Sequence, residues 1–214
     1  VQTVTAADGV PVLLDSTGNV SLFTDKTRVG YTTVGGTQQD KGSTNFRDGT
    51  TTLDVTWGVY SGGTFVDSGG VRTPDFVALI TGQVTPASVA SSLNATYSSV
   101  AGQSKLATET GRLGGSISSI GITVRGGSLA AYSIGLRDAA SRAWSASCSN
   151  CGTAGIPLTT FATSGATLSG TGADVAATGR VSGTPIGPSG AGFISSFGLS
   201  TSDGRSVTGA VLAK

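Results

Sequence analysis

The two cysteines of the chain, Cys148 and Cys151, are its first candidates for chemistry. Their spacing admits a metal clamp, a redox couple or a disulfide. A structural zinc site needs four Cys or His ligands, and the chain has two cysteines and no histidine. A redox CxxC motif opens a helix after a strand, whereas serines precede this pair and Gly152 follows it. We therefore predict a disulfide that pins a loop, and with it an oxidising compartment.

Residues for acid–base or nucleophilic catalysis are scarce. Without histidine, the Ser-His-Asp and Cys-His arrangements cannot form. Acidic residues number 12, most of them beside Gly, Ser or Thr, where Asp commonly forms turns, and Glu109 is the only glutamate. The sequence thus predicts no catalytic site, no metal and no cofactor, and a protein that is not an enzyme. A hydrolase that uses a pair of aspartates is the weaker alternative.

Aromatic side chains are the remaining candidates for contact with a ligand. On strands such residues more often pack against their neighbours, and both interpretations stay open here. The candidates are Trp57, Tyr60, Tyr97 and Trp144.

Composition narrows the class of protein. The chain has 214 residues, 34 of them glycine, with 12% charged residues and a formal net charge of +1. No basic stripe interleaved with aromatics is present, so nucleic acid is not an expected partner. No apolar run reaches the length of a membrane-spanning helix. Because the chain starts at Val1 without methionine, we expect a mature chain whose signal peptide has been removed.

Apolar and polar residues alternate along most of the chain, which is typical of strands with one buried face. About eight segments show this pattern: 53–60, 64–71, 76–83, 93–100, 112–125, 128–137, 158–169 and 192–212. Their even spacing and short turns predict an all-β fold, an antiparallel eight-stranded β-barrel, with a β-sandwich as the alternative. Stretches 85–96 and 136–146 also allow short helices.

The first 52 residues differ from the rest. Residues 1–34 predict a short N-terminal β segment, and the polar, glycine-rich residues 35–52 predict a linker or long surface loop. The barrel domain is then expected over 53–214.

The alternation also predicts how the barrel fills and closes. The terminal segment GFISSFGLSTSDGRSVTGAVL predicts a hairpin around a type I′ turn at Asp203-Gly204. We expect this hairpin to close the barrel against the strand at 53–60, because pairing the last strand with the first removes both exposed edges. The side chains expected in one interior are Trp57, Ile120, Ile122, Tyr132, Ile134, Phe193 and Phe197.

Several segments together carry a family resemblance. They are WGVY at 57–60, PDFVALITG at 74–82, NATYSSVAG at 94–102, the run LGGSISSIGITVRGGSLAAYSIGLRD with Trp144 after it, and the terminal GAGFISSFGLSTSDGRSVTGAVLAK. Their order over 53–214 resembles the small C-terminal β-barrel modules of Gram-negative envelope proteins, similar to the barrel of transferrin-binding surface lipoproteins and to barrels attached to FecR-type domains. The lipidated members begin with cysteine, so no lipid anchor is implied for a chain that starts at Val1.

The resemblance implies a place outside the cell or on the surface of a Gram-negative bacterium, with the periplasm as an alternative. We expect a non-enzymatic β-barrel that acts as a binding or adhesion module toward a protein partner. The alternative is an extracellular structural subunit of a fibre, pilus or coat, which assembles with identical subunits by strand exchange through residues 1–34. A small ligand inside the barrel has no support in the sequence.

Overall fold

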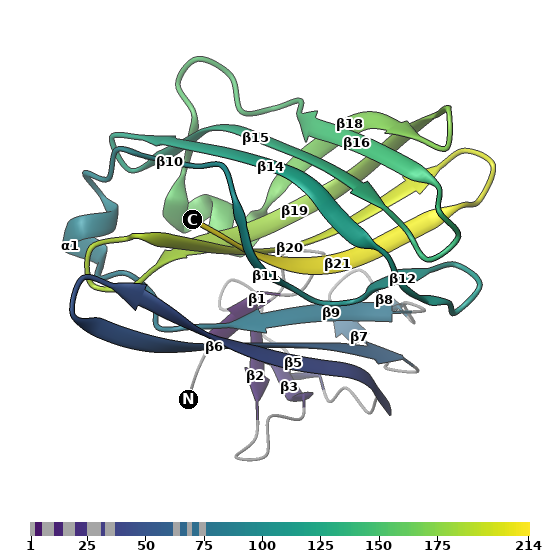
Figure 1. Cartoon of the computed structure of the whole chain (residues 1–214), viewed down its shortest axis with the longest axis horizontal. Coiled ribbons are helices and arrows are strands. Elements are labelled where there is room, and N and C mark those ends of the chain that lie inside the picture. The colour runs from purple at the N-terminus through teal and green to yellow at the C-terminus, as the bar shows by residue number, and fades with distance from the viewer. Residues whose placement is uncertain are drawn as a thin grey trace.

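A computed structural model describes residues 3–5, 11–14, 20–24, 31–32, 37–61, 65–67, 70–72 and 76–214. The turns expected near residues 8, 16–19 and 25–27 lie outside these ranges. The fold is all-β and antiparallel, with a large barrel above a smaller sheet (Figure 1). No helix in the described ranges is long and apolar enough to span a membrane.

The barrel consists of seven named strands and one irregular segment that acts as the eighth. The segment 95–108 holds β10 (Ala95–Tyr97), β11 (Val100–Gln103) and β12 (Leu106–Thr108). The others, in sheet order, are β14 (Ser116–Arg125), β15 (Ser128–Arg137), β16 (Ala143–Cys148), β18 (Ala166–Gly172), β19 (Val175–Ile186), β20 (Gly192–Thr201) and β21 (Ser206–Ala213).

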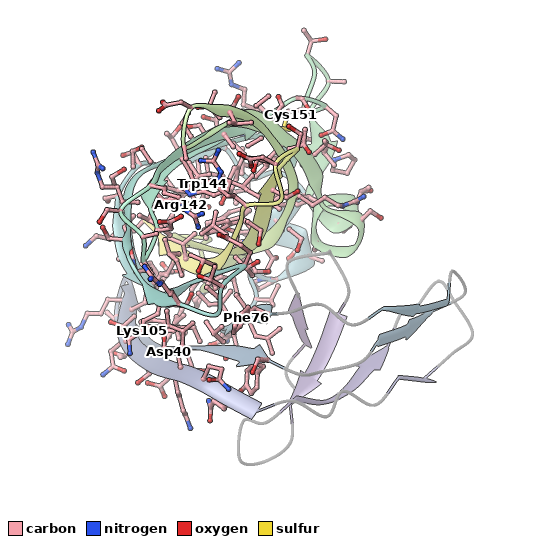
Figure 2. The ribbon with its side chains drawn as sticks, turned by 90° about the vertical axis from the view of Figure 1, so that its right-hand side faces the viewer. Asp40, Phe76, Lys105, Arg142, Trp144 and Cys151 are labelled. Atoms are coloured by element: carbon pink, nitrogen blue, oxygen red, sulfur yellow. A yellow bond between two sulfur atoms is a disulfide. The ribbon has the colours of Figure 1, made fainter. Side chains whose placement is uncertain are left out.

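Closure of the barrel depends on the segment 95–108. Its first part, β10, pairs with β14, and its later parts, β11 and β12, pair with β21. The segment therefore joins the two edges of the curved sheet, which forms a ring when viewed end-on (Figure 2). We predicted that the terminal hairpin pairs with residues 53–60. This prediction is wrong, because β21 pairs with residues in 100–108 instead.

The barrel interior is apolar and filled. Alternate residues of the strands point inward, and the largest of these include Tyr97, Tyr132, Phe193 and Phe197, while Phe161 enters the same core from the helix at 158–164; each is under 2% exposed. The ring of Phe193 contacts those of Tyr97 and Phe161, at centroid distances of 5.4 and 6.0 Å. Six of the seven predicted interior residues lie in this core, namely Ile120, Ile122, Tyr132, Ile134, Phe193 and Phe197.

The seventh, Trp57, belongs to a second core. A three-stranded sheet of β5 (Thr37–Asp48), β6 (Thr51–Ser61) and β9 (Phe76–Thr81) packs against the outside of the barrel. Its inward residues meet outward-facing Ile194, Ala210 and Leu212, while Trp57 is half-buried beside them. Strands β20 and β21 are consequently buried on both faces.

The linker predicted over 35–52 is wrong for its described part, residues 37–52. Strand β5 occupies most of this stretch and pairs with β6 from Thr37↔Ser61 to Asp48↔Thr51. Its composition is like that of a loop for two reasons. Polar residues cover its exposed face, and on the other face Gly42 lies against Trp57. The strand predicted at 53–60 exists as β6, but it pairs with β5 and β9 and not with barrel strands.

The helices are short. α1 (Ala87–Ala90) falls within the stretch 85–96, where a helix was one option, whereas 136–146 forms the hairpin between β15 and β16. The strand predicted at 158–169 is wrong in its first part, where α2 (Leu158–Ser164) replaces it. Leu158 and Phe161 stand three apart and both face the barrel core, a helical spacing that alternation does not detect.

Small strands complete the structure. β1 (Thr3–Thr5), β2 (Pro11–Leu14), β3 (Val20–Thr24) and β4 (Tyr31–Thr32) form a sheet of their own. β7 (Phe65–Asp67) pairs with β8 (Gly70–Arg72), β13 (Leu113–Gly114) with β12, and β17 (Ile156–Pro157) with β15.

Candidate functional site

The four aromatic residues predicted to contact a ligand do not come together. Tyr97 lies inside the barrel, where its hydroxyl donates to the carbonyl of Gly190 at 2.6 Å, and burial, followed by the charge of Asp48, raises its pKa to about 12. Tyr60 and Trp144 are also buried, at 5% and 2% exposure. Trp57 alone is half-buried. Their role toward a ligand stays a prediction.

One end of the barrel is built from three hairpin loops with the same geometry. In the loops 108–112, 138–142 and 201–205, the first residue's N–H donates to the fifth residue's carbonyl at 3.0, 3.0 and 2.9 Å. The fourth residue's N–H donates back to the first carbonyl at 2.9, 2.9 and 3.1 Å. The fourth residue has positive φ: 77° at Gly111, 62° at Ser141 and 85° at Gly204. These are three-residue hairpin loops with a left-handed residue.

This geometry corrects the type I′ turn predicted at Asp203-Gly204. A type I′ turn needs positive φ at two central residues, and in that loop positive φ occurs at Gly204 and not at Asp203. The three loops read TETGR, DAASR and TSDGR, so each ends in arginine. The repeated five-residue pattern was a signal in the sequence that alternation analysis missed.

Glu109 ties the three loops together. Its carboxylate, from the first loop, accepts two hydrogen bonds from Arg142 of the second, at 2.7 Å from Nη1 and 2.9 Å from Nη2. The same carboxylate accepts the backbone N–H of Ser206, which follows the third loop, at 3.0 Å. One side chain thus fixes the relative positions of three loops that lie far apart in sequence.

Asp138 holds Arg142 from the other side. Its Oδ2 accepts Arg142 Nε at 2.7 Å and the Trp144 indole N–H at 2.9 Å, and its Oδ1 accepts two backbone N–H groups. The Arg142 guanidinium carbon lies 6.0 Å from the centroid of Trp144. Arg142 and Trp144 both lie within the ring of strands in the end-on view (Figure 2), so together they cover this end of the core.

Electrostatics keep this network charged. The guanidinium of Arg142, bonded to both oxygens, outweighs burial and lowers the pKa of Glu109 to about 2. Burial alone would raise the pKa of Asp138, but hydrogen bonds from Trp144, Arg142 and the backbone together lower it. Both carboxyl groups are therefore ionised near neutral pH, the form in which they accept the hydrogen bonds from the loops.

A fourth loop joins the same end. Ala173 and Asp174, between β18 and β19, have φ of 47° and 69°, which is type I′ geometry. Arg205 donates from Nη1 to the carbonyl of Ala173 at 3.2 Å and pairs with Asp203 of its own loop. We name the four loops 108–112, 138–142, 173–174 and 201–205 the mouth loops. Their exposed residues include Thr110, Arg112, Ala140, Asp174 and Ser202.

The disulfide lies away from the mouth loops. Cys148 and Cys151 are bonded, with Cα atoms 5.7 Å apart, at the end of β16 (Figure 2), which confirms the predicted bond. Cys151 reaches the barrel core, and the Asn150 side chain between them accepts the Thr167 N–H at 2.9 Å. No group of three or more metal-ligating side chains occurs within the described ranges.

Comparisons with known proteins give a distant likeness. No family model and no curated protein matches the chain. Among solved structures, intact Ap-TbpB, with its N and C lobes, aligns with all of the chain and 46% of its own length, at TM-score 0.43 and 13% identity. Transferrin binding protein B from Haemophilus parasuis Hp5 gives 0.42 and 13% over 45% of its length. The isotype 1 protein from serogroup B Neisseria meningitidis gives 0.35 and 11% over 42%. The chain spans less than half the length of these proteins.

Proposed function

We propose that this chain is a non-catalytic binding module that recognises a protein partner through the mouth loops. The observation that carries the proposal is the tie made by Glu109, which holds three hairpin loops in one arrangement before any partner arrives. Loops on a rigid scaffold commonly carry recognition, and preorganised loops lose little conformational entropy on binding.

The filled interior supports recognition on the outside of the barrel. Aromatic rings of Tyr132, Phe161 and Phe193 occupy the space in which some eight-stranded barrels hold a small ligand. A partner therefore meets loops, outer faces or strand edges. The disulfide supports a secreted or cell-surface location, because such bonds persist in oxidising compartments. A Gram-negative cell surface is part of the same proposal.

Site-specific photocrosslinking tests the role of the mouth loops. A photoreactive amino acid placed at Ala140 or Ser202, both exposed at the mouth, should give the same adduct with one protein from the fluid around the cells that carry this chain. The matched position Ser133, exposed on the barrel wall, should give none. Adducts from Ser133 alone, or none from either mouth position, would contradict the proposal.

Self-assembly by strand exchange is the second candidate function, and one observation favours it. Strand β5 is at the edge of its sheet, with β6 on one side and no strand paired to the other among the residues described. Light scattering coupled to size-exclusion chromatography separates the candidates. A binding module stays monomeric at all concentrations, whereas a structural subunit forms larger species that a deletion of 1–34 abolishes.

A further inference from the structure

The edge strand β5 offers a long, regular row of backbone groups. It pairs with β6 without interruption from Asp40↔Val59 to Asp48↔Thr51, and the one irregularity, between Gln38 and Asp40, comes before this run. The stretch contains no proline. A strand edge of this kind can add a further strand through main-chain hydrogen bonds.

Both ends of this edge are fastened to the barrel. At one end, the Lys105 backbone N–H donates to Asp40 at 3.0 Å, and the Lys105 ammonium lies 3.4 Å from the same carboxylate (Figure 2). At the other end, Asp48 accepts the backbone N–H of Ser189 at 2.7 Å and also its hydroxyl. The strand between these anchors is held extended before any partner binds, which lowers the entropic cost of adding a strand.

The exposed side chains of β5 give the edge a chemical preference. Lys41, Ser43, Asn45 and Arg47 are exposed, while the residues between them face the barrel. Neither Lys41 nor Arg47 has an ion-pair partner within the described part of the chain. On the exposed face of the neighbouring strand β6, Asp54 is opposite Asn45 and not opposite Lys41 or Arg47. The edge therefore presents two cations that are six residues apart on one face.

We propose that the edge of β5 from Lys41 to Asp48 binds an extended acidic segment of another protein as an additional strand. Residues six apart on a strand share a face, so two acidic side chains at this spacing meet Lys41 and Arg47 directly. Pairing β5 with β5 of a second copy fits less well, because it brings four cations to one edge. This surface lies outside the mouth loops and adds a second point of recognition.

A short synthetic strand peptide is the probe. It carries two glutamates six residues apart on one face, threonines between them, valines on the other face and a fluorescent label, and its control has lysines in place of the glutamates. Fluorescence anisotropy should show binding of the acidic peptide and much weaker binding of the basic one. Amide hydrogen exchange should slow over 41–48 when the acidic peptide is bound.

Charge reversal of the edge makes the test specific. The double variant Lys41→Glu, Arg47→Glu changes two exposed side chains, and it should weaken binding of the acidic peptide about tenfold or more and strengthen binding of the basic one. The matched control Arg125→Glu, Lys214→Glu makes the same change in net charge elsewhere and should bind like the parent chain.

Several outcomes would overturn the proposal. The acidic peptide does not bind, or both double variants weaken its binding equally. The bound peptide slows amide exchange outside β5 and not over 41–48. The parent chain forms a dimer, and the Lys41→Glu, Arg47→Glu variant is monomeric. None of the peptide outcomes affects crosslinking from the mouth loops, so the two proposals fail separately.

Discussion

Glu109 and Arg142 are 33 residues apart in the chain, yet the carboxylate of one accepts both terminal guanidinium nitrogens of the other at 2.7 and 2.9 Å. The two side chains are 23% and 18% exposed, so the pair is largely shielded from water. A bidentate, partly buried ion pair fixes the relative orientation of its two side chains, which a single hydrogen bond on the surface does not. The pair joins the first mouth loop to the second.

The substitution Glu109→Gln keeps the shape of the side chain and removes its charge. Arg142 then has Asp138 as its remaining carboxylate partner, and we expect the free energy of unfolding to fall by about 2–3 kcal/mol, somewhat below the range for a fully buried pair. Urea unfolding followed by circular dichroism measures the loss. Asp203→Asn is the control, because its pair with Arg205 is more exposed, and it should cost clearly less. Equal losses in the two variants would refute the special role of Glu109.

Acid stability should report the same pair. The pKa of Glu109 is lowered from 4.5 to about 2, so its ionised form is favoured in the folded state. The stabilisation is therefore complete above pH 4.5 and is lost as the pH falls toward 2. In unfolding measurements across this range, the difference in stability between the parent chain and Glu109→Gln should shrink as the solution becomes more acidic. A difference that stays constant down to pH 2 would show that the pKa is not lowered.

Local patterns in the sequence predict much of the barrel. Alternation from 128 to 137 coincides with β15, and the C-terminal run predicts the hairpin of β20 and β21. Six of the predicted interior residues share the core because a regular strand fixes the face of each side chain. The disulfide was predicted because two cysteines without any histidine are too few ligands for a structural zinc site. These features depend on residues that are near one another in sequence.

Features that depend on distant partners were missed. The segment TQQDKGSTNFRD forms β5 by pairing with β6, where Trp57 lies against Gly42, and nothing inside the segment indicates this partner. Closure through 95–108 depends on pairing with β21, about a hundred residues later. The five-residue pattern shared by three mouth loops is visible in the sequence. The partners of Glu109 are not, because they come close only when the barrel brings these loops to one end.

Gly42 and Gly102 form a slot for the indole of Trp57. A Cβ atom at Gly42 would lie 2.6 Å from Trp57 Cε2, and one at Gly102 would lie 2.9 Å from Cζ3, both closer than packing allows. Either glycine-to-alanine substitution should force the indole to move and destabilise the fold by about 1–3 kcal/mol. Thermal unfolding measures the loss, and Ser43→Ala, on the exposed face of the same strand, should be near neutral. An unchanged melting temperature for Gly42→Ala would rule out the slot.

The disulfide should contribute little to the stability of the whole fold. It closes a ring between residues only three apart, and for so small a ring the chain-entropy model gives about 2 kcal/mol. The double substitution of Cys148 and Cys151 by serine should therefore lower stability by this amount and leave the β circular dichroism signal intact. Mass spectrometry of the unreduced parent chain should find no free thiol. Complete unfolding of the double variant would show that the bond holds more than its loop.

Tyr132 and Ser195 form a hydrogen bond inside the barrel, with the two hydroxyl oxygens 3.0 Å apart. Both residues are buried, at 1% exposure. Ser195→Ala leaves the tyrosine hydroxyl without this partner, and the cost of an unsatisfied buried group is about 1–3 kcal/mol. Adding Tyr132→Phe to that variant removes the stranded hydroxyl and should recover part of the loss. Urea unfolding of the parent, both single variants and the double variant completes the cycle. If the double variant is as unstable as the sum of the singles, the two hydroxyls do not interact.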